Sequence, residues 1–204
     1  MYRPAFVPSS TKMTLNQGCY VMERRLKEIG FTVSKKTPGD GSCMFHALLD
    51  QIQLNPSLPP FAENHWELRY KIVYEGFEKF IDKLEWPNYP KVGSKLDWKN
   101  NMTSPSTWGD EIVLQLASNL LEVDIHIISA FPVSSNNGVT IIKPVDLSSQ
   151  KQPIYLFLFP ETDFVSAHYQ SVRPASTPAS PPASHRWWHQ LRRLCATRAV
   201  KMNR

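Results

Sequence analysis

The sequence has few cysteines and no long apolar run. Its 204 residues include three cysteines, Cys19, Cys43 and Cys195, which lie far apart. A disulfide scaffold or a zinc site of paired cysteines needs more cysteines at closer spacing, so we expect free thiols and a reducing, cytoplasmic compartment. No stretch approaches the roughly 18 apolar residues of a membrane-spanning helix, and the N-terminus lacks the apolar run of a signal peptide. We therefore expect neither a membrane-spanning nor a secreted protein.

Cofactor motifs are also missing. The sequence contains no glycine-rich phosphate loop, no HExxH pattern and no dinucleotide-binding fingerprint, so no cofactor is expected. His65 lies close to Glu63 and Glu67, but the spacing is not that of a metal site and a solvated helix face is the better interpretation. We predict no metal.

The charge is distributed unevenly. The net charge is +5, yet residues 175–204 carry six basic side chains and no acid, whereas residues 1–174 carry 17 basic and 18 acidic ones. The main body is therefore nearly neutral, and the basic character belongs to a C-terminal tail that can be nuclear-targeting or partner-binding.

Composition divides the chain into four parts. Residues 1–14 form an N-terminal extension, 15–173 a folded domain, 174–185 an extended Pro/Ala/Ser linker and 186–204 a basic, tryptophan-containing tail. Trp187, Leu191 and Leu194 recur at helical spacing in the tail, which would suit an acidic partner, an anionic membrane or nucleic acid. The alternative is a solvated, frayed terminus. We expect a monomer.

Hydrophobic periodicity predicts helices early and strands late. Helices are expected over residues 15–29, 43–53 and 62–84, and another after a Thr107 cap, continuing to 121; residues 85–106 read as loop. Strands are expected at 31–33, 123–128, 139–142, 154–159 and 169–172, with a hairpin turn at 136–138. This order predicts an α+β (mixed α/β) fold in which a small, late-sequence β-sheet packs between helices.

Cys43 occupies the position expected of a nucleophile. It follows the loop Pro-Gly-Asp-Gly-Ser and opens a predicted helix, whose dipole favours a thiolate and whose free N–H groups can face an oxyanion. The alternative is a small buried cysteine at a helix start. His168 lies directly before a late strand, 125 residues downstream, which is the order of a cysteine-protease pair. His46, one turn after Cys43, is expected to point away from the helix tip and to be structural.

Three segments together resemble the ovarian-tumour (OTU) family of cysteine deubiquitinases. They are the Asp-Gly-Ser-Cys-Met-Phe-His-Ala segment at 40–47, Trp-Gly-Asp-Glu-Ile-Val-Leu-Gln-Leu-Ala at 108–117, and His-Tyr-Gln-Ser-Val at 168–172. The blocks occur in the family's order, and the resemblance covers roughly residues 28–173.

The resemblance implies a papain-like, cofactor-free hydrolase that cleaves the isopeptide bond between ubiquitin and lysine, with ubiquitin or polyubiquitin as partner. It assigns Cys43 as the nucleophile, His168 as the general base and Asp40 to the active site, and it places the oxyanion loop at Gly41 and Ser42. Trp108 and Glu111 are interpreted as scaffold at the start of a helix.

Two positions depart from the family pattern. Asp110 stands where many members have glycine, and Gln170 stands where some branches have an acidic residue or asparagine that orients the histidine. A glutamine amide accepts the imidazole N–H less strongly than a carboxylate does, which leaves Asp40, Gln170 or another residue as the third member. The alternative function is therefore a catalytically weak or inactive ubiquitin-binding protein whose basic tail targets an acidic partner.

Overall fold

A five-stranded mixed sheet divides the molecule into layers. The computed structural model describes residues 15–84, 93–131, 138–145, 149–159 and 167–175. The strand order is β1-β5-β4-β2-β3, formed by Phe31–Lys35, His168–Pro174, Ile154–Phe159, Ile125–Ser129 and Val139–Ile142. β2 and β4 run parallel, and the other neighbouring pairs are antiparallel. The expected α/β class and late-sequence sheet are confirmed, except that the edge strand β1 comes from early in the chain.

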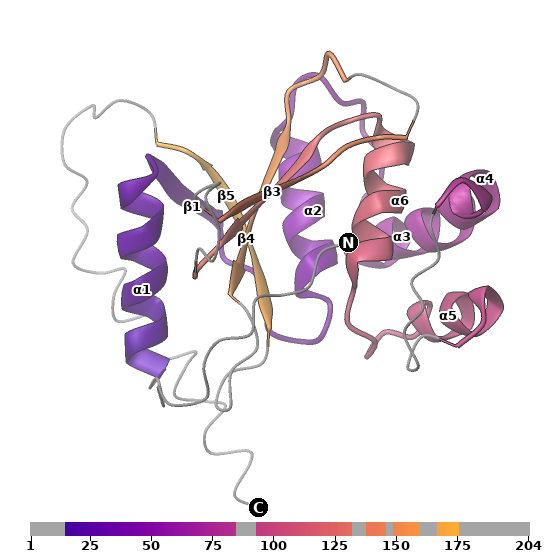
Figure 1. Ribbon diagram of the computed structural model, residues 1–204, viewed down its shortest axis with the longest axis horizontal. Helices are drawn as coiled ribbons and strands as arrows, with labels where there is room; N and C mark the ends of the chain where they lie inside the picture. Colours follow the sequence, from indigo (N-terminus) through magenta and orange to yellow (C-terminus); the bar gives the residue numbers. More distant parts are fainter. Residues whose placement is uncertain (1–14, 85–92, 132–137, 146–148, 160–166, 176–204) are drawn as a thin grey trace, which may run out of the picture.

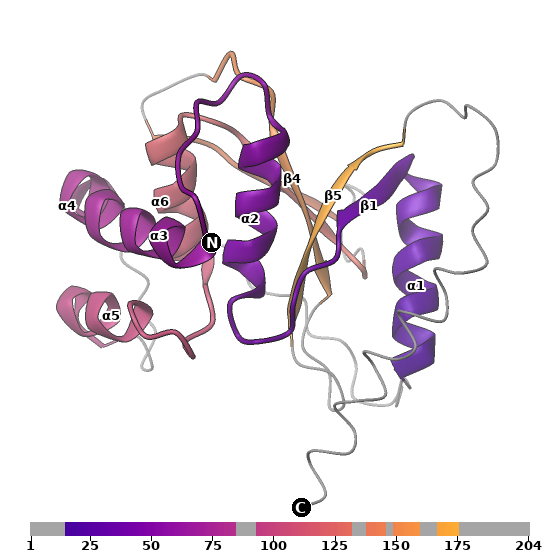
Figure 2. The same ribbon diagram turned by 180° about the vertical axis from the view of Figure 1, so that it is seen from behind.

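Helices cover both faces of the sheet (Figures 1 and 2). Of the helices that the structure describes, α1 (Leu15–Glu28) lies on one side, and α2 (Cys43–Leu54) and α6 (Glu111–Leu121) lie on the other. Beyond them is an outer layer made of α3 (His65–Tyr70), a π-helical turn η1 (Lys71–Gly76), α4 (Phe77–Phe80), a short 3₁₀ turn η2 (Ile81–Lys83) and α5 (Lys95–Met102). Among the helices described, none has the length and apolar character needed to cross a membrane.

Each face of the sheet has its own hydrophobic core. The larger core lies on the α2–α6 side, where alternate residues of β2 and β4 such as Ile125 and Leu156 are fully buried. The smaller core packs Leu26 of α1 against Phe157 and Val172. β2 and β4 are nearly continuous apolar runs because both of their faces are covered. These two cores fix the sheet on which the functional residues are carried.

Buried polar contacts fix α2 relative to β5. The side chain of Asp50 on α2 accepts hydrogen bonds from Ser34 Oγ (2.8 Å) and Ser171 Oγ. Next to it, Gln51 donates to Ser171 Oγ at 2.8 Å and accepts from the Tyr155 N–H at 3.0 Å. Buried polar groups that satisfy one another in this way hold one relative position rather than many. The C-terminal half of α2 is thereby set against the middle of β5.

Several predicted element boundaries need correction. Residues 85–106 were expected to be loop, but α5 forms there, with Ser94 and Asp97 in a reciprocal capping box. The predicted 62–84 helix begins at His65, after the N-cap Asn64, and contains the π-helical turn. Helix α6 is capped by Asp110, not Thr107. The remaining strands agree with prediction to within about two residues, although 136–137 of the predicted hairpin turn, most of the linker, the extension at 1–14 and the tail lie outside the described residues.

Candidate active site

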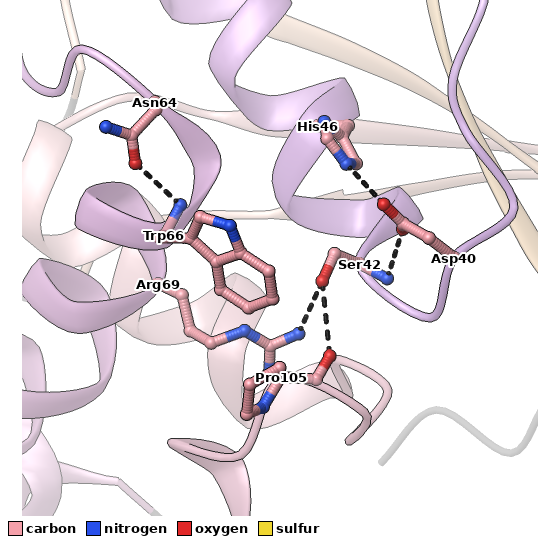
Figure 3. Close-up of polar contacts among 7 residues, drawn as sticks. All are labelled: Asp40, Ser42, His46, Asn64, Trp66, Arg69 and Pro105. Atoms are coloured by element: carbon pink, nitrogen blue, oxygen red, sulfur yellow. Dashed lines mark hydrogen bonds and ion pairs between the residues drawn. The ribbon is translucent and has the colours of Figure 1, made fainter.

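The loop before α2 is held in a tight turn by its own aspartate. Asp40 Oδ1 accepts the Ser42 backbone N–H at 2.8 Å, and Gly41 has a φ of +91°, a conformation that side chains disfavour. A Cβ at Gly41 would also lie 3.6 Å from the Trp108 ring. The Ser42 N–H, expected to be available to an oxyanion, therefore donates to Asp40 in this structure (Figure 3).

Cys43 is the first residue of α2 and is half-buried. Burial raises the pKa of its thiol; the N–H groups of Tyr169 and Met44 act to lower it, and the charge of Asp40 raises it further. The expected thiolate preference at a helix start is present in the N–H contacts, but desolvation outweighs it. A separate base is therefore needed to ionise this thiol.

The first residues of β5 lie directly beside the thiol. The backbone N–H of Tyr169 hydrogen-bonds to the Cys43 sulfur, although 126 residues separate the two. His168 is the preceding residue, opens β5 and pairs with Phe159 of β4. The structure thus brings the strand end that carries His168 to the head of the helix that carries Cys43.

Gln170 lies on the same face of β5 as His168, two residues along. Its buried amide accepts the Thr37 N–H at 3.3 Å and donates to the Lys35 carbonyl. Both contacts tie β5 to the chain that leads from β1 to the Cys43 loop. The geometry shown for Gln170 is that of a loop anchor.

His46 contacts the loop, contrary to expectation. Its Nε2 lies 2.9 Å from Asp40 Oδ2, and its ring stacks on that of His65 with centroids 3.9 Å apart (Figure 3 shows the Asp40 pair). Burial acts to raise the pKa of Asp40, but the hydrogen bonds from His46 and the Ser42 N–H outweigh it, so the pKa is lowered. Asp40 is an ionised carboxylate that faces His46.

Asp40, His46 and His65 also bring three metal-ligating atoms within 4.8 Å of one another. Zinc needs ring nitrogens whose in-plane lone pairs converge on one point. The imidazoles of His46 and His65 are in ring contact instead, with planes tilted by 31°. A metal bound to the same atoms would compete with the contact between His46 Nε2 and Asp40 Oδ2.

A different tryptophan from the expected one holds the start of α6. Trp98 donates its indole N–H to Asp110 Oδ2 at 2.7 Å, while Asp110 Oδ1 accepts from the backbones of Ile112 and Val113. Trp108 is instead 42% exposed and flanks Gly41. Trp108 therefore lies at the rim of the loop that precedes Cys43 and does not cap the helix.

Arg69 was missed by sequence reasoning. Its guanidinium lies under the loop and donates to Ser42 Oγ at 3.1 Å, and the Ser42 hydroxyl donates to the Pro105 carbonyl at 3.3 Å (Figure 3). A signal was present in the sequence, since Arg69 falls on the same helical stripe as the apolar residues Ile72 and Val73, and the structure shows that stripe to be buried. An arginine on a buried stripe indicates a constrained charge.

Known proteins match both the sequence and the fold. The family model for OTU-like cysteine proteases matches residues 38–169. OTU domain-containing protein 6A of Mus musculus is 26% identical over 147 residues, which are 69% of this chain and 45% of that protein. Ubiquitin thioesterase otu2 of Schizosaccharomyces pombe is 27% identical over 150 residues, 72% of this chain and 47% of that protein. The chain thus spans about half the length of these two relatives.

Solved structures share the fold. The OTU domain of OTUD1 has a TM-score of 0.55 at 18% identity, covering 76% of this chain and 94% of that one. The viral OTU domain protease from Taggert virus has a TM-score of 0.52 at 17% identity, covering 74% and 84%. With the family model spanning the loop, Cys43, α6 and the start of β5, the chain belongs to the OTU-like cysteine protease family.

Proposed function

We propose that the chain is a thiol-dependent deubiquitinase that hydrolyses the isopeptide bond between the C-terminal glycine of ubiquitin and a lysine. The observation that carries the proposal is the contact of the Tyr169 N–H with the Cys43 sulfur. His168 directly precedes Tyr169, so this contact brings the histidine's part of β5 to the thiol. Family membership supports it, as do the names of relatives such as "Ubiquitin thioesterase otu2".

In the proposed reaction His168 removes the proton from the Cys43 thiol, and the sulfur attacks the glycine carbonyl carbon. The tetrahedral oxyanion is held by backbone N–H groups of Gly41 and Cys43, because the Ser42 N–H is occupied by Asp40. The C–N bond then breaks as His168 returns the proton to the lysine amine. Water, deprotonated by His168, hydrolyses the thioester to a carboxylate and the free thiol, without a cofactor.

A ubiquitin probe with a C-terminal electrophile tests the nucleophile. We expect one covalent adduct with the full chain and none with Cys43→Ala. Cys19→Ala and Cys195→Ala are the matched controls and should react like the unmodified chain. Adduct formation at either of those cysteines would overturn the assignment.

The second candidate is a ubiquitin-binding protein with weak or no catalysis. The observation that favours it concerns Gln170, which stands where some branches of the family carry a residue that orients the histidine. Both amide contacts of Gln170 go instead to the backbone of Lys35 and Thr37. Hydrolysis of polyubiquitin followed over time separates the two candidates. Turnover that disappears with His168→Ala excludes the binding-only function, and tight ubiquitin binding without turnover supports it.

The basic tail is proposed to direct the enzyme to an anionic surface or acidic partner. Its six positive charges are attached to a body of nearly zero net charge, so the tail dominates the protein's attraction to anions. A cytoplasmic protein with a nuclear fraction is consistent with such a tail.

A further inference from the structure

Arg69 is among the largest fully buried side chains of the described residues, with 2% of its surface exposed. It projects from α3 and stacks its guanidinium over the Phe45 ring at 4.0 Å. One terminal nitrogen donates to the Met102 carbonyl at 2.9 Å and the other to Ser42 Oγ at 3.1 Å. The side chain thereby joins α3, the end of α5 and the residue before Cys43.

Among the described residues, no carboxylate forms an ion pair with this buried cation. None of the ion pairs that the structure gives for the described residues includes Arg69, and its Nε is buried without a hydrogen bond. Burying an unpaired charge costs several kcal/mol, and a neutral side chain of similar size would avoid that cost. The position therefore calls for an explanation other than packing.

The charge lies beside the residue that precedes the proposed nucleophile. Burial lowers the pKa of Arg69 to about 10, while the charges of Asp40 and Cys43 act to raise it, so the side chain stays protonated at neutral pH. Asp40 and Cys43 are the first and last residues of the nucleophile turn. Ser42, whose hydroxyl accepts from Arg69 at 3.1 Å, lies between them in the turn, so the cation attracts negative charge on either side of it.

The hydrogen bond to Ser42 adds a geometric constraint. Ser42 is 1% exposed and precedes α2, but its hydroxyl does not cap that helix. The hydroxyl instead accepts from Arg69 and donates to the Pro105 carbonyl. Arg69 thus fixes the side chain next to Cys43 from below, and Asp40 fixes the same residue through its N–H (Figure 3).

We propose that Arg69 is a positioning residue whose buried charge favours the thiolate of Cys43 and the oxyanion that follows, and whose bond to Ser42 holds the nucleophile turn. This inference rests on the proposed role of Cys43 as nucleophile. Arg69 acts through the loop and through its field, without contacting the substrate.

Alkylation of Cys43 by iodoacetamide across pH tests the electrostatic part without ubiquitin. The full chain carries Cys19→Ser and Cys195→Ser, and Cys43 modification is measured by mass spectrometry. We expect Arg69→Met to shift the midpoint upward by about one unit, which slows alkylation near neutral pH about tenfold. Arg69→Lys should retain most of the rate, since it keeps the charge. The exposed Arg24, paired with Glu28 on α1, supplies the matched control Arg24→Met, with an unchanged midpoint.

Ser42→Ala separates the geometric part from the charge. It should leave the alkylation midpoint unchanged and lower kcat on a ubiquitin substrate, because the charge stays while the turn loosens. Thermal unfolding identifies the variants that fold, and Arg69→Gln replaces Arg69→Met if the latter does not.

A folded neutral variant with the original midpoint overturns the proposal. Failure of both neutral variants to fold also counts against it, since stability alone would then account for Arg69. If the unmodified chain does not cleave ubiquitin but the Arg69→Met shift is observed, the proposed function fails and the inference about Arg69 stands.

Discussion

The Asp40 carboxylate makes two contacts that shape the nucleophile turn. Oδ1 accepts the Ser42 N–H, and Oδ2 pairs with His46 at 2.9 Å. We predict that Asp40→Ala lowers kcat/KM about a hundredfold, equal to about 2.7 kcal/mol of transition-state stabilisation, because the turn that aligns the oxyanion N–H groups is released.

Initial-rate kinetics on a ubiquitin substrate measure this loss. Asp40→Asn keeps an oxygen for the Ser42 N–H and should recover much of the activity. The control is Asp82→Ala, which removes an exposed carboxylate paired with Lys95 far from the turn in sequence. Equal activity of Asp40→Ala and the unmodified chain would exclude an active-site role for Asp40.

Gln170 gives a prediction about stability rather than chemistry. Its amide pairs with the backbone of Lys35 and Thr37, and Thr37 is itself buried. Gln170→Ala leaves a buried N–H and a C=O without partners, so we expect the free energy of unfolding to fall by about 2 kcal/mol.

Urea denaturation measures the change, with Gln53→Ala on the exposed part of α2 as the control. Gln170→Asp should also destabilise, since a carboxylate cannot donate to the Lys35 carbonyl. If Gln170→Ala unfolds like the unmodified chain but loses its activity, Gln170 orients His168 after all.

For single residues, the sequence predicts those roles that depend only on neighbours in the chain. Cys43 and its loop are recognised because the glycines, the aspartate and the helix start are contiguous. The partnership of His46 with Asp40 and the burial of Arg69 could not be predicted, since each depends on an orientation fixed by packing. Arg69 lies 27 residues from Ser42 and 33 from Met102, and only the fold makes them neighbours.

Among the helices and strands, α6 depends strongly on one residue, its N-cap Asp110. Asp110 accepts from two backbone N–H groups of α6 and from the Trp98 indole. Asp110→Ala removes the acceptor of all three donors, so we predict a loss of about 2 to 3 kcal/mol in unfolding free energy at pH 7.

The pH dependence of that loss has a defined sign. Burial raises the pKa of Asp110, although its hydrogen bonds act to lower it. The folded chain therefore holds the proton more tightly than the unfolded chain, so the contribution of Asp110 is fullest below its unfolded pKa and declines as pH rises through the folded one. The difference between Asp110→Ala and the unmodified chain should grow as pH falls from 7 to about 4. Denaturation of both proteins at pH 7 and at about pH 4 measures this difference. A difference that shrinks as the pH falls would contradict a raised pKa of Asp110.

The strands were predictable because β-branched and aromatic runs bounded by polar segments leave few alternatives. Helix α5 was missed because only Trp98 and Met102 of its eight residues are buried, which gives almost no periodic signal. Its capping box, Ser94 with Asp97, was the local clue. The cap of α6 was misplaced because Thr107 and Asp110 both suit an N-cap, and the Trp98 contact that selects Asp110 comes from a separate helix.

Over the whole molecule, the site depends on one long-range pairing. β5 joins the sheet between β1 and β4, so strands from the two ends of the domain become neighbours. This arrangement places the head of α2 beside the start of β5. A strand order of this kind is set by the competition among all possible strand pairings. The hydrophobic periodicity of a single segment carries no information about that competition.

The tail and the domain are expected to act separately. Residues 176–204 carry six basic groups and no acid, whereas the site residues that the structure describes lie between Asp40 and Gln170. We predict that deleting 176–204 leaves kcat on a small ubiquitin substrate unchanged and abolishes binding to phosphatidylserine vesicles. In the intact chain this binding should weaken steeply with salt, because exposed charges are screened beyond about 10 Å at 0.1 M.

Vesicle co-sedimentation at 50 and 200 mM salt measures the binding, with phosphatidylcholine vesicles as the uncharged control. A duplex DNA titration at the same salts provides the second arm, and tighter binding there would favour nucleic acid over membrane as the tail's target. A fall in kcat on deletion would contradict the separation and would place part of 176–204 in the catalytic domain. The remaining body has almost no net charge, so binding should be lost with the tail. Vesicle and DNA binding that persists unchanged after deletion would exclude a targeting role for the tail.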